Sequence, residues 1–153
     1  MNSELRDLYQ DIILDHNKNP KNFRRMENAT LQAEGHNPLC GDKLELFLRV
    51  ENEIIVDVSF EGEGCAISKA SASLMTTFLN GKSLSEAMAV FDGFQKLVTV
   101  ENEGDADFES MGKLAVFAGV REYPSRIKCA ILAWHTFKSA LDSGGNESTI
   151  STE

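Results

Sequence analysis

The chain has 153 residues, and its 24 Asp and Glu residues outnumber its 15 Lys and Arg residues, which gives a formal net charge of −9. This length favours one domain with a full hydrophobic core, and the acidic charge disfavours nucleic-acid binding, which needs clustered Lys and Arg. Three cysteines cannot all pair with one another, so a disulfide framework is disfavoured. Residues 1–7 lack the apolar core of a secretory signal, and the longest apolar run has six residues, at 129–134, so we expect a cytoplasmic protein with free thiols and no membrane span.

The N-terminal segment predicts an amphipathic helix over residues 4–17. Ser3 is suited to cap its first turn, because a serine side chain can accept a hydrogen bond from the unpaired N–H groups there. Pro20 marks its end, because proline cannot continue a helix. The apolar face has the i, i+3, i+4 spacing of a helix and consists of Leu5, Leu8, Tyr9, Ile12 and Ile13.

Residues 43–60 predict two paired β-strands. Apolar and polar residues alternate on both sides of a short polar break at 51–53, a pattern typical of a hairpin with one apolar face. A weaker strand pattern lies at residues 31–34. The apolar positions of the hairpin are Leu44, Leu46, Leu48 and Val50 before the break and Ile54, Val56, Val58 and Phe60 after it.

Helical spacing follows the hairpin. One helix begins near Ile67 and ends before Gly81, which is suited to the left-handed position that follows a helix. Ser83 and Glu86 have the spacing of a capping box and predict the start of a second helix. The later segments are an acidic loop at 101–107, a short helical stretch with Phe108, Met111 and Leu114, and a helix at 125–141.

The order of the predicted elements indicates the fold class. One helix, then strands, then several helices is the α+β pattern, in which helices pack on an antiparallel sheet. We predict a single domain over residues 1–142, because no repeat and no linker interrupts this segment. The remaining residues, 143–153, are polar and are predicted to form a disordered tail.

Each cysteine lies at a junction between predicted elements. Cys40 lies in a turn-rich loop before a strand, Cys65 lies between a strand and a helix, and Cys129 lies in the opening turns of the last helix. The unpaired N–H groups and the positive dipole end of a helix N-terminus favour a thiolate over a thiol. Arg126 and Lys128 are expected to act on Cys129 in the same direction.

Asp42 follows Cys40 with only Gly41 between them, and glycine permits the tight backbone that would direct both side chains to one place. Three thiolates and one carboxylate make a four-ligand set suited to zinc. The alternative is that each cysteine is a small buried hydrophobe, a common role for free cysteine. No C-x-x-C pair is present, but the position of all three cysteines at junctions rich in Gly, Pro or Asp favours a metal site.

Other candidate sites are less specific. Gly62 and Gly64 follow a strand and precede a helix, as in dinucleotide-binding turns, but the third glycine and the lysine of a phosphate loop are both missing. His36 lies near Cys40 and is an alternative ligand. His16, at the end of the first helix, is suited to interact with the helix dipole.

A set of short motifs identifies a family. The motifs are Asp15-His16, Asn19-Pro20, Asn22, Asn37-Pro38, Cys40-Gly41-Asp42, the segment from Phe60 to Ser68, Ala70-Ser71-Ala72-Ser73 and Arg126-Ile127-Lys128-Cys129-Ala130. Together they resemble the U-type proteins of iron–sulfur cluster assembly, from residue 8 to about residue 138. The resemblance implies an α+β fold with helices packed on a small three-stranded antiparallel sheet, a sandwich similar to SufE and NifU proteins. It also implies a single metal site formed by Cys40, Asp42, Cys65 and Cys129.

Three features distinguish the branches of this family. Lys128 stands where the scaffold branch has a histidine, and residues 123–127 depart from the chaperone-binding motif of that branch. The 63 residues between Cys65 and Cys129 exceed the scaffold spacing by a helix and a loop. These features resemble the SufU-type branch, whose members bind zinc and accept sulfur from a pyridoxal-phosphate cysteine desulfurase of the SufS type.

The resemblance implies a persulfide relay rather than an enzyme that acts on a small molecule. Cys40 is the candidate sulfur acceptor, because its loop contains Pro38 and Gly41 and no helix holds it, and Arg126 is a candidate support for the anionic site. Two alternatives are a scaffold that assembles a [2Fe–2S] cluster on the same ligands and passes it to apo-proteins, and a non-catalytic module with structural zinc. The implied partners are a SufS-type cysteine desulfurase and downstream iron–sulfur assembly proteins, with no nucleic acid and no membrane.

Overall fold

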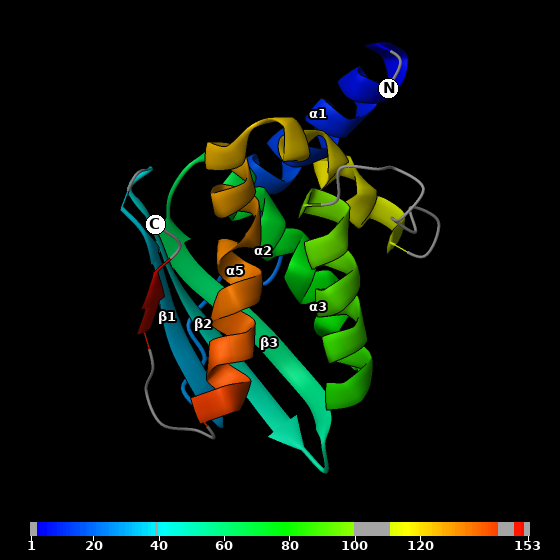
Figure 1. Cartoon of the computed structure of the whole chain (residues 1–153). Coiled ribbons are helices and arrows are strands. Elements are labelled where there is room, and N and C mark those ends of the chain that lie inside the picture. The colour runs from blue at the N-terminus through cyan, green and yellow to red at the C-terminus, as the bar shows by residue number, and fades with distance from the viewer. Residues whose placement is uncertain (1–2, 39, 100–110, 144–148, 152–153) are drawn as a thin grey trace.

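The computed structural model describes residues 3–38, 40–99, 111–143 and 149–151, which form one sheet with helices gathered mainly on one side of it (Figure 1). None of the helices in these ranges is long and apolar enough to span a membrane. The elements in chain order are α1 (Ser3–Lys18), β1 (Leu31–Asn37), β2 (Asp42–Glu51), β3 (Ile54–Glu63), α2 (Ala66–Leu79), α3 (Leu84–Thr99), η2 (Gly112–Glu122), α5 (Pro124–Ser143) and β4 (Thr149–Ser151).

The sheet has the strand order β3-β2-β1-β4. Strands β1, β2 and β3 pair in an antiparallel manner, which confirms the predicted three-stranded antiparallel sheet. In the hairpin, Leu46 lies opposite Phe60 and Leu48 lies opposite Val58, and all four side chains are buried. Side chains alternate across a strand, so Leu44, Leu46, Leu48, Val58 and Phe60 share the face that the helices cover. The prediction is wrong for Ile54 and Val56, which are exposed. A register shift between Arg49 and Val50 interrupts the alternation and buries Ile55 in their place.

The turn of the hairpin lies at the predicted polar break. Glu51 pairs with Ile54, so Asn52 and Glu53 form a two-residue loop, with φ angles of 51° and 63°. Two positive φ angles are the signature of a type I′ turn, whose twist matches that of the strands it joins. This turn fixes the pairing next to it, with Val50 opposite Ile55.

The fourth strand, β4, lies in the C-terminal segment. Its three residues pair in parallel with β1, with Ile150 opposite Gly35. The sequence predicts a disordered polar tail over residues 143–153, and of this segment the structure describes Ser143, at the end of α5, and β4. Three residues are too few for a periodic pattern, so the strand depends on the edge of β1 that receives it.

Helices α2, α3 and α5 cover the apolar face of the sheet (Figure 1). The core between them contains Trp134 of α5, whose ring stacks on that of Phe94 from α3 with centroids 4.5 Å apart. Phe94 also meets Phe117 of η2 edge to face at 5.8 Å. Aromatic pairs in these arrangements add to the burial of apolar area, so they stabilise the packing of α5 and η2 against α3.

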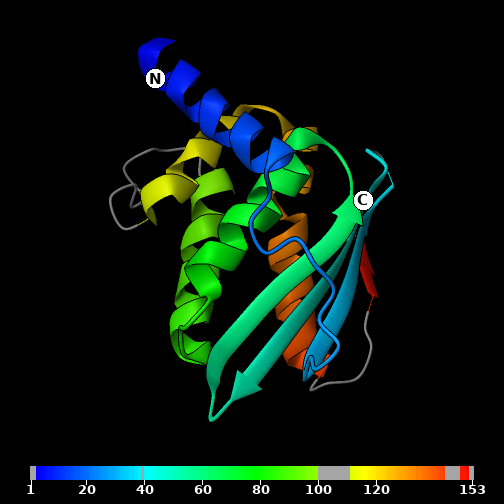
Figure 2. The ribbon, with the colours of Figure 1, turned by 180° about the vertical axis from the view of Figure 1, so that it is seen from behind.

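The opposite face of the sheet is covered by the chain between α1 and β1, which crosses it in an extended path (Figure 2). Met26 and Phe47 are buried there, and the guanidinium of Arg25 lies 5.2 Å from the ring centroid of Phe47. Phe23 and Arg24 continue this cover at the β3 edge, where the N–H of Arg24 donates to the carbonyl of Phe60 at 2.9 Å.

The residues predicted to end one helix and to begin the next have these roles in the structure. Gly81 has a φ of +87°, and the Ser83–Glu86 capping box forms in both directions at 3.1 Å. The short stretch predicted near Met111 is a 3-10 helix, η2, whose buried Leu114 and Phe117 have the threefold spacing of that helix. The predicted acidic loop at 101–107 and Phe108 lie outside the described residues.

Candidate metal centre

The three cysteines and Asp42 come from three parts of the fold that meet at one end of the sheet. Cys40 lies in the connection between β1 and β2, and Asp42 is the first residue of β2. Cys65 is the N-cap of α2, and Cys129 lies in the second turn of α5. The short connection after β1 and the packing of α2 and α5 on the sheet therefore determine the site.

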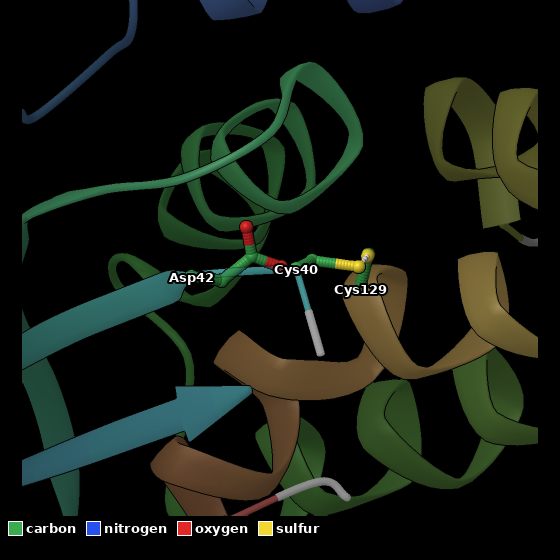
Figure 3. Close-up of side chains that lie close together, drawn as sticks. All are labelled: Cys40, Asp42 and Cys129. Atoms are coloured by element: carbon green, nitrogen blue, oxygen red, sulfur yellow. Dashed lines mark hydrogen bonds between the residues drawn. The ribbon is translucent and has the colours of Figure 1, made fainter. Parts of the chain in front are cut away.

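Cys40, Asp42 and Cys129 form a cluster in which one ligand atom from each lies within 4.8 Å of the others (Figure 3). The thiol of Cys129 lies 3.2 Å from Sγ of Cys40, although 89 positions separate them in the chain. Cys129 and Asp42 are fully buried, while Cys40 is half-buried. Within this cluster only Cys40 is partly exposed, and Cys65 beside it is half-buried as well.

Cys65 meets this cluster through Asp42. The backbone N–H of Cys65 donates to Oδ1 of Asp42 at 2.8 Å, and its Sγ lies 3.9 Å from Oδ2. At the N-cap of α2, Sγ of Cys65 also accepts a hydrogen bond from the N–H of Ser68 at 3.4 Å. The N-terminus of α2 therefore directs one of its backbone N–H groups to the Cys65 sulfur.

The sequence predicted that Arg126, Lys128 and the start of the helix favour the thiolate of Cys129. For the chain without a metal ion this prediction is wrong. Burial raises the pKa of the Cys129 thiol far above its usual range, and its hydrogen bond to Cys40 acts in the same direction. The anionic neighbours Cys65 and Asp42 raise this pKa further. The nearby positive residues of α5 do not offset these effects, because desolvation of a buried group dominates.

This electrostatic situation is the one that a metal cation resolves. Several acidic groups share a buried space, and their combined ionisation needs a positive charge among them. A soft divalent cation bound by thiolates supplies that charge and keeps coordinating thiols deprotonated. The donor set of three sulfur atoms and one carboxylate, described for Cys40, Asp42, Cys65 and Cys129, therefore fits a zinc ion.

The cluster of Cys40, Asp42 and Cys129 does not include the remaining candidates. Arg126 is exposed in the first turn of α5, three residues before Cys129. His36 is exposed on β1, opposite Lys43. The prediction that His16 interacts with its own helix dipole is incomplete, because His16 is buried and its Nδ1 lies 2.7 Å from Oγ of Ser73 on α2.

Two residues at the site were not identified from the sequence. Asn37 is fully buried at the end of β1, and its Nδ2 lies 3.5 Å from Oδ2 of Asp42 and 3.6 Å from Sγ of Cys129. Gly64 adjoins the same carboxylate, since an added Cβ would lie 2.5 Å from Oδ1 of Asp42. Both residues stand in motifs that carry the family resemblance, Asn37 before Pro38 and Gly64 before Cys65, but the sequence indicated no role for either at the metal site.

Comparisons with known proteins agree with the motifs. Residues 8–130 match the family described as NifU-like N terminal domain. The zinc-dependent sulfurtransferase SufU of Bacillus subtilis is 37% identical over 147 residues, which cover 95% of this chain and 98% of that protein. The iron–sulfur cluster assembly scaffold protein IscU of Streptococcus pyogenes is 35% identical over 144 residues, which cover 94% of this chain and 89% of that protein.

A solved structure gives the same result. The putative iron–sulfur cluster assembly scaffold protein of the SUF system from Fervidobacterium islandicum superposes with a TM-score of 0.80 at 35% identity. The superposition covers 92% of this chain and 99% of that one. These matches confirm the resemblance to U-type iron–sulfur assembly proteins. The chain belongs to the family of NifU-like N-terminal domains, which the motifs around its three cysteines indicate.

Proposed function

We propose that this protein accepts sulfur from a cysteine desulfurase of the SufS type and passes it to downstream proteins of iron–sulfur cluster assembly. The observation that carries the proposal is the position of Cys40: it is half-buried on a turn, whereas Cys129 is fully buried on α5 and the equally half-buried Cys65 is the N-cap of α2. The likeness to a zinc-dependent sulfurtransferase over nearly the whole chain supports the same activity.

Zinc is the proposed resident metal, held by the four candidate ligands. When bound, zinc keeps the thiols deprotonated near neutral pH while lowering their reactivity. The chain supplies the surroundings: the N–H of Cys65 orients the carboxylate of Asp42, and the N–H of Ser68 supports the sulfur of Cys65. Arg126, in the first turn of α5, is proposed to support the anionic site or the approaching partner.

Cys40 is the proposed sulfur acceptor. Its thiolate attacks the outer sulfur of the persulfide on the desulfurase, by the chemistry of thiol–disulfide exchange. A new bond forms between Sγ of Cys40 and the outer sulfur, while the bond from that sulfur to the desulfurase cysteine breaks. The desulfurase cysteine leaves as a thiolate with the electron pair of the broken bond, so the step requires no external oxidant or reductant.

The conformation of the loop suits this role. The N–H of Cys40 donates to the carbonyl of Asn37 at 3.3 Å, and Gly41 has a φ of +72°, a left-handed conformation that glycine adopts without strain. Cys40 is therefore held by a turn, whereas Cys65 and Cys129 are carried by helices. A residue on a turn can move toward a partner more easily than a residue fixed in a packed helix.

The test is sulfur transfer from a purified desulfurase, with cysteine as the sulfur donor. Intact-protein and peptide mass spectrometry would measure the gain of one sulfur atom and its position. We expect the sulfur on Cys40, and we expect Cys40→Ala to abolish both the gain and the stimulation of desulfurase turnover. Thr136→Val, a buried change on α5, is the matched control and should transfer sulfur normally. Normal stimulation by Cys40→Ala would overturn the assignment.

A second candidate function is that of a scaffold for cluster assembly. Relatives that are named as iron–sulfur cluster assembly scaffolds support this alternative. In this case an iron–sulfur cluster is the cargo, and the same four residues would hold it. Anaerobic reconstitution with iron and sulfide separates the two functions. A stable, stoichiometric [2Fe–2S] cluster that transfers to an apo-ferredoxin would favour the scaffold, whereas retention of zinc without cluster transfer would favour sulfur transfer.

A further inference from the structure

Asn37 is a fully buried amide in direct contact with two of the candidate ligands. Its Nδ2 lies 3.6 Å from Sγ of Cys129 and 3.5 Å from Oδ2 of Asp42, so one side chain connects α5 with the start of β2. Burial of an amide is unfavourable unless its hydrogen-bonding groups find partners. The N–H groups of Asn37 find theirs on the two ligands, which are anionic when they bind a metal.

The carbonyl of the same side chain has no such partner. Oδ1 of Asn37 is buried and makes no hydrogen bond with the described residues. Turning the amide over would place this oxygen against the carboxylate of Asp42, where two acceptors repel one another. The orientation that leaves Oδ1 unpaired is therefore the one in which the N–H groups face the ligands, and the contact with the ligands outweighs the unpaired carbonyl.

We propose that Asn37 is a positioning residue of the metal centre, which holds Cys129 and Asp42 in place and reduces the charge on the Cys129 sulfur. The proposal rests on the proposed function, in which these residues bind zinc. A hydrogen bond from N–H to a metal-bound thiolate withdraws charge from sulfur and makes it less nucleophilic. The amide thus keeps Cys129 as a stationary ligand.

The hydrogen bonds around the other ligands also distinguish the stationary ligands from the proposed acceptor, Cys40. Asp42 receives the N–H of Cys65, and Cys65 receives the N–H of Ser68. With Asn37 on Cys129, each of these three ligands has an N–H donor among the described residues, whereas Sγ of Cys40 receives the Cys129 thiol. The backbone carbonyl of Asn37 accepts from the N–H of Cys40, so Asn37 also begins the turn that carries the reactive cysteine.

The decisive variant is Asn37→Leu, which keeps the approximate shape of the side chain and removes the N–H groups and the unpaired carbonyl together. The change relieves the unpaired Oδ1 but leaves Oδ2 of the buried Asp42 without its N–H donor, and loss of one partner of a buried hydrogen bond is destabilising. We expect the metal-free variant to remain folded and to unfold at a modestly lower urea concentration than the wild type. Ser59→Ala is the matched control, because Ser59 on β3 is also buried with Oγ unpaired among the described residues, yet it lies opposite Phe47 rather than at the cysteines.

We expect Asn37→Leu to change both the zinc affinity and the absorption spectrum of the bound metal. Zinc affinity, measured by competition with a chromogenic chelator, should fall by roughly 10–100-fold in Asn37→Leu, the usual effect of losing a group that supports a metal ligand. With Co²⁺ in place of zinc, the sulfur-to-cobalt charge-transfer band should shift to lower energy, because sulfur loses a hydrogen bond. Ser59→Ala should match the wild type in both measurements. Asn37→Ala, which cannot overpack the site, serves as a second variant and should show the same two changes.

The result that overturns the proposal is an unchanged zinc affinity and an unchanged cobalt spectrum in both Asn37 variants while the wild type binds one metal ion. Neither readout depends on sulfur transfer, so a failure of Cys40 as the acceptor would leave this result standing. A wild-type protein that binds no zinc would overturn the metal assignment itself and this proposal with it.

Discussion

The backbone N–H of Cys65 donates a 2.8 Å hydrogen bond to Oδ1 of Asp42, which joins the N-cap of α2 to the first residue of β2. Asp42 is fully buried, so this bond replaces water for one of its oxygens. It also directs Oδ2 toward the thiols, with Sγ of Cys65 at 3.9 Å. The two residues that bracket the hairpin in sequence thus form one half of the candidate metal centre.

Gly64 allows this contact, and Gly64→Ala should disrupt it. An added Cβ would lie 2.5 Å from Oδ1 of Asp42, too close for two non-bonded atoms, so the carboxylate must move. We expect the variant to fold and to lose zinc affinity by about 10-fold or more, since a ligand that is displaced binds poorly. Chelator competition measures the change. Gly119→Ala, where an added Cβ meets no atom within 4 Å, is the control; equal affinities in the two variants would contradict the prediction.

Gly35 allows α5 to approach β1, and its replacement should affect stability. A Cβ at Gly35 would collide with the hydroxyl of Thr136, a buried residue of α5. We expect Gly35→Ala to lower the free energy of unfolding by about 1–3 kcal/mol, as overpacking of a core does. Urea unfolding measures this change. The double variant with Thr136→Ala should recover part of the loss relative to Thr136→Ala alone, and absence of recovery would show that the collision is not the cause.

His16 should make the metal-free protein sensitive to acid. Burial lowers the pKa of His16 from its ordinary value of 6.5, and nearby Lys113 and Lys21 act in the same direction while Asp15 opposes them. The N–H of Lys21 donates to Oγ of Ser73, which leaves the Ser73 hydroxyl proton for Nδ1 of a neutral His16.

Because the pKa of His16 is lower in the folded state, its contribution to stability is complete above the ordinary value and is lost as the pH falls below it. We expect urea midpoints of the metal-free protein to decline as the pH falls below about 6.5, and His16→Gln to reduce that decline. The exposed His36 provides the control, as His36→Gln should leave the slope unchanged. An equal decline in the His16 variant would assign the acid sensitivity to other groups, of which His135 is one, since burial lowers its pKa too.

Metal binding should stabilise the fold, because the ligands lie on elements that unfolding separates. A ligand that binds only the native state at about 100 times its Kd adds about 2.7 kcal/mol to the free energy of unfolding. We expect zinc to raise the Tm of the wild type and a strong chelator to reverse the change. The double variant Cys65→Ser, Cys129→Ser should show no zinc-dependent shift. The same Tm with and without zinc in the wild type would contradict this prediction.

Local patterns in the sequence predicted most of the elements. The alternation around residues 51–53 predicted β2, β3 and their turn, and the Ser83–Glu86 pair predicted the start of α3, because both signals act between neighbours in the chain. The sequence predicted a short helical stretch near η2 but not its 3-10 geometry, and it did not predict the three-residue strand β4. The apolar spacing of η2 follows a period of three rather than 3.6 residues, and β4 exists only as a partner of β1.

By itself the sequence determined the α+β class, the presence of the hairpin and, through its family resemblance, the identity of the candidate ligands. Only the tertiary structure decided how these residues act on one another. It placed the Cys129 thiol 3.2 Å from Cys40, buried it so that its pKa rises, and set the amide of Asn37 against it. Burial, desolvation and contacts between distant segments depend on the packing of α5 against the sheet, and no local pattern of residues encodes them.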